Sequence, residues 1–161
     1  MVHRLQRTLI AAVLLALAAQ SAAAAPDKSA DPRMVARGKY LVETAGCNDC
    51  HTAGYAQSAG KTPEKDWLTG DALGWRGPWG TTYATNLRVF MSAMGKDAWL
   101  KHARSMEPRP PMPWFNVRKM TDQDLTAIHA YVRSLGPAGK PAPAYVPPNQ
   151  TPAGPYVQFP Q

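Results

Sequence analysis

Hydrophobic residues recur at helical spacing most clearly in residues 121–136. The apolar stripe of this segment consists of Leu125, Ile128, Val132 and Leu135. Thr121 and Asp124 have the spacing of a capping box, with an acidic residue in place of the usual Glu or Gln. Gly136 and Pro137 follow the stripe, and this pair ends helices. The pattern predicts a helix that begins after Thr121 and ends before Gly136.

A second apolar stripe predicts a helix near the start of the chain. Its members are Met34, Gly38, Leu41 and Ala45. Asp31 suits the N-cap and Pro32 the first helical position, where the missing amide of proline costs nothing, and Gly46 ends the helix. Glycine lowers helix propensity by about 1 kcal/mol relative to alanine. Gly38 therefore marks either a close approach of another backbone or ring, or a weak position that the helix tolerates, and the sequence leaves both open.

The remaining segments are less regular. Asp97 can cap a helix that extends to Met106, with Trp99 and Ala103 on the same face, before Pro108 stops it. Residues 54–86 contain six glycines and two prolines with little periodicity, which predicts an irregular segment with one short helix at 63–68.

The C-terminal composition differs from the rest of the chain. Residues 137–161 contain eight prolines, which exclude a regular helix, together with Tyr145, Tyr156 and Phe159. The aromatic residues favour an extended tail that lies against the domain or a partner. A disordered tail is the alternative.

The N-terminus has the layout of a cleaved secretory signal peptide. Arg4 and Arg7 precede an apolar run at 9–19, which is too short to span a bilayer, and small residues follow at 21–25. Cleavage after Ala24 leaves 137 residues, enough for one domain. We therefore expect a periplasmic protein of a bacterium without stable membrane insertion. A retained membrane anchor is the alternative.

The net charge of the chain indicates which classes of partner it can bind. The formal net charge is +7, and it falls to +5 when Arg4 and Arg7 leave with the signal peptide. A moderately basic surface indicates an acidic protein partner or an anionic membrane face. A secreted chain without a basic run is a poor fit for nucleic-acid binding.

The predicted chemistry lies in the run Cys47-Asn48-Asp49-Cys50-His51. At the spacing C-x-x-C-H, two thiols can add to the two vinyl groups of one haem while the adjacent histidine binds the iron. A redox-active cysteine pair would open a helix in a βαβ context, and a structural zinc site needs about four ligands. A plain disulfide beside a chance histidine is the remaining alternative. The motif predicts one covalent haem, haem c, in a protein of an oxidising compartment.

The second axial ligand decides whether the iron carries electrons or binds small molecules. Our candidate beside His51 is Met112, because three prolines in residues 109–114 restrict the backbone around it. A thioether ligand favours ferrous iron and raises the reduction potential. The local sequence leaves further candidates open: Met91, Met94, Met106, Met120, His102 and His129.

With these residues in order, the chain resembles the class I c-type cytochromes, specifically the small bacterial kind with one haem. The resemblance covers about residues 32–136. It rests on the first helix with Gly38 and Tyr40 leading into residues 46–52, on residues 74–87 and 109–114, and on residues 125–135. The chain departs from many relatives after Leu87, where residues 88–90 stand in place of a Thr-Pro turn, so no element is predicted between Leu87 and Asp97.

The resemblance implies an all-α class I cytochrome c fold whose N- and C-terminal helices cross near Gly38 and Tyr131 around one covalently bound haem. It also implies Met112 as the distal ligand. The implied organisation is a signal peptide at 1–24, a short linker at 25–31, a cytochrome c domain at 32–136 and a proline-rich tail at 137–161.

By the same analogy, Arg76, Trp79 and Asn86 contact the haem propionates. Their alternative role is that of ordinary loop and core residues.

These features predict a periplasmic one-electron carrier rather than an enzyme, with redox proteins as partners. Six basic residues near the expected distal ligand would attract an acidic docking surface: Lys96, Lys101, Arg104, Arg109, Arg118 and Lys119. The first alternative is a haem subunit or dedicated partner of a periplasmic dehydrogenase or oxidase that docks through the tail. The second is a sensor or enzyme with an open iron position, which requires Met112 to be absent from the iron.

Overall fold

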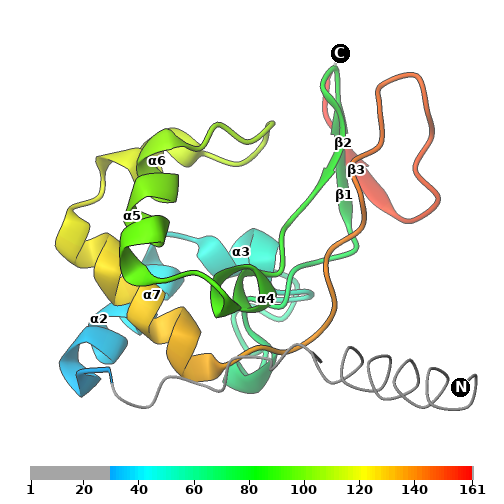
Figure 1. The fold of residues 1–161 in the computed structure, drawn as a ribbon. Coiled ribbons are helices and arrows are strands. Elements are labelled where there is room, and N and C mark those ends of the chain that lie inside the picture. The colour runs from blue at the N-terminus through cyan, green and yellow to red at the C-terminus, as the bar shows by residue number, and fades with distance from the viewer. Residues whose placement is uncertain (1–29, 161) are drawn as a thin grey trace, which may run out of the picture.

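The computed structural model describes residues 30–160, so the predicted signal peptide lies outside the described residues. The helices are α2 (Pro32–Thr44), α3 (Cys47–His51), α4 (Leu87–Ser92), α5 (Lys96–Ser105), α6 (Trp114–Lys119) and α7 (Asp122–Leu135), with a 3-10 turn η1 (Glu64–Asp66). The strands are β1 (Gly74–Gly77), β2 (Gly80–Tyr83) and β3 (Tyr156–Gln158). In Figure 1, α2, α5, α6 and α7 gather on one side and the sheet lies on the other, with α3 and α4 between them.

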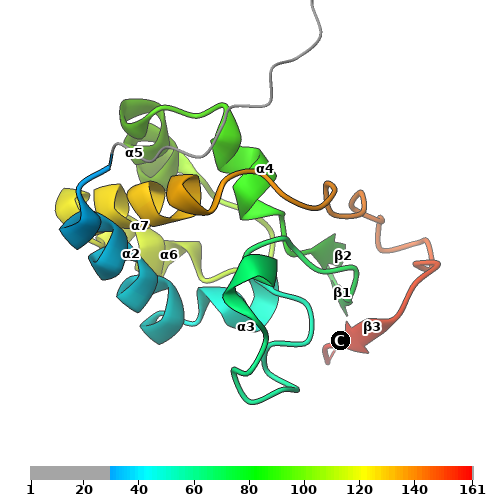
Figure 2. The same cartoon turned by 90° about the horizontal axis from the view of Figure 1, so that it is seen from below.

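The most extensive contact between helices is that of α2 with α7, which lie side by side in Figure 2. A Cβ added at Gly38 would lie 2.0 Å from the carbonyl oxygen of Ala127 and 2.7 Å from Cβ of Tyr131. The interpretation of Gly38 as a close approach is therefore confirmed. Val42 is also buried on this face, whereas Ala45 is exposed because it lies beyond the last turn as the C-cap. The prediction for Ala45 was wrong.

The predicted helix caps have specific partners. Oδ1 of Asp31 accepts a hydrogen bond from the amide of Arg33 at 2.8 Å, and Thr121 Oγ1 accepts one from the amide of Asp124 at 3.1 Å. Asp97 is not the cap of α5, because Gly95 takes that position and the carboxylate of Asp97 lies in the first turn. A carboxylate in the first turn still interacts favourably with the positive end of the helix dipole.

The segment after Asn86, where no element was predicted, forms α4. Asn86 caps this helix by accepting a hydrogen bond from the amide of Val89 at 3.0 Å. The buried guanidinium of Arg88 donates to the carbonyl of Gly136 at 2.6 Å, to that of Leu135, and to that of Lys65 at 2.7 Å. Arg88 thus binds the unpaired carbonyls at the end of α7, which a helix terminus otherwise leaves without partners.

A small sheet accompanies the helices of the predicted all-α fold. β1 and β2 are antiparallel, β3 runs parallel to β1, and the strand order is β2-β1-β3. The hairpin turn needs Gly80, whose φ is +94°. The sequence showed no strand alternation because β1 and β2 have four residues each and include Gly74, Gly77 and Gly80.

The proline-rich tail lies against the domain, as one of the two expectations proposed. Val146 exchanges two backbone hydrogen bonds with Thr81 of β2, at 2.7 and 3.0 Å, and β3 extends the sheet beside β1. The ring of Phe159 packs on Trp79 with centroids 5.3 Å apart. The described part of the tail therefore encloses the hairpin on both edges.

The core lies between the helices and the irregular segment around η1. Its buried residues are Val42, Trp67, Leu68, Met91, Trp99, Ala103, Leu125, Ile128, Tyr131 and Val132. The single 3-10 turn of η1 falls within the short helix predicted at 63–68. Within residues 30–160, none of the helices has the length and apolar character needed to cross a bilayer.

Candidate haem site

The C-x-x-C-H motif forms the short helix α3. Gly46, at φ +71°, turns the chain from α2 into this helix, a left-handed conformation that glycine adopts without strain. Positions i, i+3 and i+4 of a helix share one face. Cys47, Cys50 and His51 have this spacing, so the helix presents the two thiols and the imidazole to the same side.

The imidazole of His51 is fixed by a backbone carbonyl. Its Nδ1 lies 2.7 Å from the carbonyl oxygen of Thr85, and since a carbonyl only accepts, Nδ1 carries the proton and donates. The lone pair is then on Nε2, the arrangement of a metal-binding histidine. Burial lowers the pKa of His51, with the Thr85 contact opposing it, so the neutral form is favoured.

The two cysteines are free and partly buried. Burial raises the pKa of Cys47 to about 11, and burial also raises the pKa of Cys50, with a further contribution from the carboxylate of Asp49. Both thiols are therefore protonated at neutral pH, unlike the low-pKa thiols of redox-active pairs. In the described part of the chain, no three His, Cys, Asp or Glu side chains are grouped so that they could hold a metal ion.

Met112 lies in the connection between α5 and α6, in residues 106–113, which we term the ligand loop. Met112 is half-buried, and its carbonyl accepts a hydrogen bond from the amide of Trp114 at 2.9 Å. The ligand loop extends toward the hairpin in Figure 1. Thr82 Oγ1 of β2 donates to the carbonyl of Pro110 at 2.8 Å.

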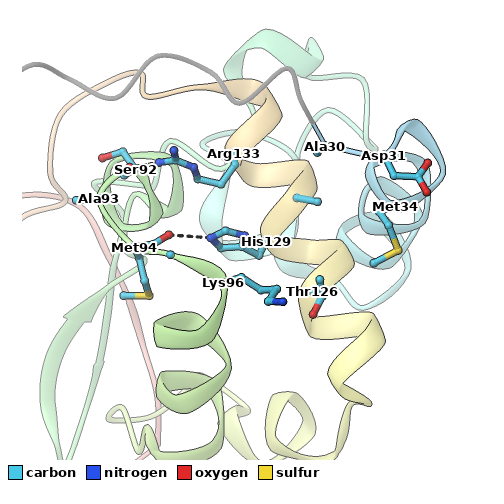
Figure 3. A pocket seen from close by; sticks show the side chains of 12 residues that line it. Ala30, Asp31, Met34, Ser92, Ala93, Met94, Lys96, Thr126, His129 and Arg133 are labelled. Carbon is cyan, nitrogen blue, oxygen red and sulfur yellow. Dashed lines mark hydrogen bonds between the residues drawn. The ribbon is translucent and has the colours of Figure 1, made fainter.

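Two of the rival candidates for the axial ligand, Met94 and His129, lie in a cavity that contains no motif residue. This cavity, of about 620 Å³, opens between α7 and the connection of α4 with α5 (Figure 3). His129 points across it, with Nε2 2.8 Å from the carbonyl oxygen of Met94. His129 is thus oriented by the Met94 carbonyl within this cavity, which none of Cys47, Cys50 and His51 lines.

The remaining candidate ligands occupy packing or capping positions. Met91 is buried in the helical core, and Met120 packs against the same core at the end of α6. His102 lies against the ring of Phe90, with centroids 5.1 Å apart, and Met106 is the C-cap of α5.

With this geometry in place, comparison with known proteins assigns the family. The family model described as cytochrome c matches residues 35–136, more than half of the chain. The chain belongs to the cytochrome c family. This cytochrome is an electron-transfer haem protein, and Cys47, Cys50 and His51 form the motif that carries haem c.

The curated relatives of this cytochrome include subunits of dehydrogenases. It is 30% identical over 153 residues to the cytochrome c subunits of alcohol dehydrogenase (quinone) from Gluconacetobacter polyoxogenes and Komagataeibacter europaeus. It is 28% identical over 121 residues to a nicotinate dehydrogenase subunit of Pseudomonas putida. These matches cover 88% and 69% of this chain, but 30% of each alcohol dehydrogenase subunit and 9% of the nicotinate dehydrogenase subunit. No solved structure matches the cytochrome significantly.

The residues of α3 fit a covalent haem. Two protonated thiols on one helix face are available to form thioethers, and the neutral imidazole beside them presents Nε2. Thr85, whose carbonyl orients the ring, had no sequence signal because a backbone carbonyl carries no residue identity.

The three residues predicted to contact propionates have protein partners in the structure. Arg76 donates to the carbonyls of Gln150 at 2.6 Å and Pro148 at 3.3 Å, and Trp79 Nε1 donates to the carbonyl of Trp75 at 3.3 Å. The amide of Asn86 donates to the carbonyls of residues 138 and 140, at 2.8 and 3.0 Å. Their role as propionate contacts stays a prediction.

Proposed function

We propose that this cytochrome is a one-electron carrier whose iron is ligated by His51 and Met112, with the haem attached through Cys47 and Cys50. The observation that carries the proposal is the 2.7 Å contact of His51 Nδ1 with the Thr85 carbonyl, which leaves Nε2 for the iron. When bound, the haem supplies an iron that gains and loses one electron.

Met112 is the best candidate for the second ligand because its rivals have different roles. Met91 and Met120 contribute to the core, and His129 is hydrogen-bonded to the carbonyl of Met94. Met112 lies instead in the ligand loop, held against β2 through Pro110. A ligand held by both its own loop and the hairpin rearranges little on electron transfer, which favours a carrier over an open-site sensor.

The proposed set of residues around the haem includes Arg76, Trp79 and Asn86 as propionate contacts. Arg76 and Trp79 belong to the hairpin, and Asn86 follows it by three residues as the N-cap of α4. All three side chains carry N–H donors, which suit carboxylate acceptors. To bind a propionate, each donor must share or exchange the carbonyl that it contacts in the protein.

We also propose that the protein acts in the periplasm after removal of residues 1–24. The charged and apolar layout of that segment supports export. Covalent haem attachment through cysteines fits the same compartment.

The partner is proposed to be a dehydrogenase with an acidic docking surface. The relatives are named as dehydrogenase subunits, and the basic residues at 96–119 flank the ligand loop. The tail is a poor candidate for the main docking element, because its described part already pairs with β1 and β2. A truncation at Gly136 would therefore disturb the hairpin as well as any partner contact.

The axial ligand is tested by the ferric absorption band that arises from charge transfer between methionine sulfur and iron. We expect the band in the wild-type cytochrome, its loss in Met112→Ala, and its retention in the control Met94→Ala. Loss of the thioether should also lower the reduction potential. A wild-type protein without the band, or a Met112→Ala variant that keeps it, would refute the assignment, and the former result would favour the open-site sensor.

A further inference from the structure

The tail segment at Tyr145 and Val146 is fastened to the turn of the β1–β2 hairpin. The hydroxyl of Tyr145 donates to the carbonyl of Trp79 at 2.9 Å, and Val146 forms a two-bond bridge with Thr81. A Cβ at Gly80 would lie 2.5 Å from the carbonyl oxygen of Val146 and 2.7 Å from the Tyr145 hydroxyl oxygen. The turn and the tail are therefore in direct contact, and these contacts fix the position of the tail relative to the turn.

The same tyrosine reaches the ligand loop. The guanidinium carbon of Arg109, three residues before Met112, lies 4.0 Å from the centroid of the Tyr145 ring. This is close for a cation over an aromatic face. Together with the hydrogen bond from Thr82 to Pro110, it ties the tip of the ligand loop to the hairpin and tail.

The base of the ligand loop is held separately, from the helical side. Arg118 of α6 donates to the carbonyl of Ser105 at 2.8 Å and forms an ion pair with Glu107 at 3.0 Å. Arg104 of α5 donates to the carbonyls of Arg118 and Met120. These contacts hold the start of the loop against α6, whereas its tip is held by Thr82 and Tyr145.

We propose that Tyr145 is a positioning residue for the axial ligand: through Arg109 it holds the ligand loop closed, so that the proline-rich tail stabilises Met112 on the iron. The inference rests on the proposed function, since it requires Met112 as a ligand. It gives the tail a role within the cytochrome itself. Tyr145 touches neither the iron nor the thioether.

The expected effect follows from the exposure of the pair. Tyr145 and Arg109 are both exposed, and a cation over an aromatic ring at an exposed site changes an equilibrium by about two- to fivefold. Removing the ring should raise the population in which Met112 has left the iron by that factor. An external ligand such as imidazole binds the ferric iron only in that population, so its apparent affinity should rise equally.

The experiment is titration of the ferric holoprotein with imidazole, followed by bleaching of the methionine-to-iron band. Tyr145→Ala and Arg109→Gln should each lower the imidazole dissociation constant by about two- to fivefold, and the double variant should add little to either. Tyr145→Phe keeps the ring over Arg109 and should largely restore the wild-type value. The matched control is Tyr40→Ala, because Tyr40 is also exposed and has the guanidinium of Arg37 5.5 Å from its ring centroid.

The outcomes separate the two proposals. If the wild-type ferric protein lacks the band, the assignment of Met112 fails and the role of Tyr145 fails with it. If the band is present but Tyr145→Ala and Arg109→Gln bind imidazole as the wild type and Tyr40→Ala do, only the role of Tyr145 is refuted. If Tyr145→Ala does not yield holoprotein, Arg109→Gln, a change on an exposed loop, decides the question by the same titration.

Discussion

Replacing Gly38 by alanine tests the helix contact on which the fold depends. The added Cβ would lie 2.0 Å from the carbonyl oxygen of Ala127, 2.6 Å from its carbonyl carbon, and 2.7 Å from Cβ of Tyr131. None of these atoms can move by a change of rotamer. Because Cβ atoms essentially never approach closer than 3.0 Å, α2 and α7 must separate by about 1 Å.

The cost of that separation exceeds the gain in helix propensity. A gap of about 0.5–1 Å removes a quarter to a half of the dispersion attraction between facing atoms. Overpacking a well-packed contact costs about 1–3 kcal/mol. Here the added methyl group would meet backbone atoms, and it would do so between α2 and α7, the helices with the most extensive contact. Alanine returns about 1 kcal/mol of helix propensity. We expect the free energy of unfolding to fall by about 2 kcal/mol, since the backbone clash places the cost at the upper end of the range.

The assay is urea unfolding of the holoprotein, followed by tryptophan fluorescence and circular dichroism. Gly154→Ala is the matched control, because its Cβ would meet only the carbonyl oxygen of Ala72, at 3.9 Å, and we expect its stability within about 0.5 kcal/mol of wild type. If Gly38→Ala unfolds at the wild-type urea midpoint with an unchanged slope, the close contact of α2 with α7 does not limit stability and the reasoning is wrong.

Two further predictions concern the buried guanidinium of Arg88 and the basic side chains at 96–119. Arg88→Met should lower the free energy of unfolding by about 2–4 kcal/mol, because the carbonyls at the end of α7 lose buried, charge-assisted donors. The control is Arg37→Met, which removes an exposed ion pair with Asp124. In the same urea assay it should lower the free energy of unfolding by at most about 1 kcal/mol. Electron exchange with an acidic partner should slow as salt rises, since the basic side chains at 96–119 act over a Debye length of about 10 Å at 0.1 M ionic strength. Stopped-flow rates that do not change with ionic strength would exclude steering by these charges.

Local features of the chain were predicted well because their physical causes are local. A cap needs only a side chain two or three residues from an amide, so Asp31 and Thr121 could be assigned from the sequence. Gly136 ends α7 for the same kind of reason, at φ +70°. The start of α5 was predicted two residues late. Gly95 and Asp97 are both acceptable near a helix start, and only the backbone conformation shows that Gly95 is the N-cap.

The crossing of the first and last helices was expected from the family resemblance, but other contacts between distant segments were missed. β3 pairs with β1 across about eighty residues of sequence, and its residues belong to a proline-rich segment without strand alternation. Arg88 had no predicted role, yet it is buried against the end of α7. Such contacts depend on which chain ends meet in space, and short strands and single side chains carry no periodic signal of that meeting.

The sequence by itself determined the chemistry of α3 and the family, because Cys47, Cys50 and His51 meet on one helix face through helical spacing alone. Only the tertiary structure decided how the imidazole is turned, since its partner is the carbonyl of Thr85, 34 residues away. It likewise decided that Gly38 marks a close helix contact and that the tail lies beside the ligand loop. The spacing of residues along the chain determines which side chains share one face of a helix, whereas tertiary packing determines which distant segments contact that face.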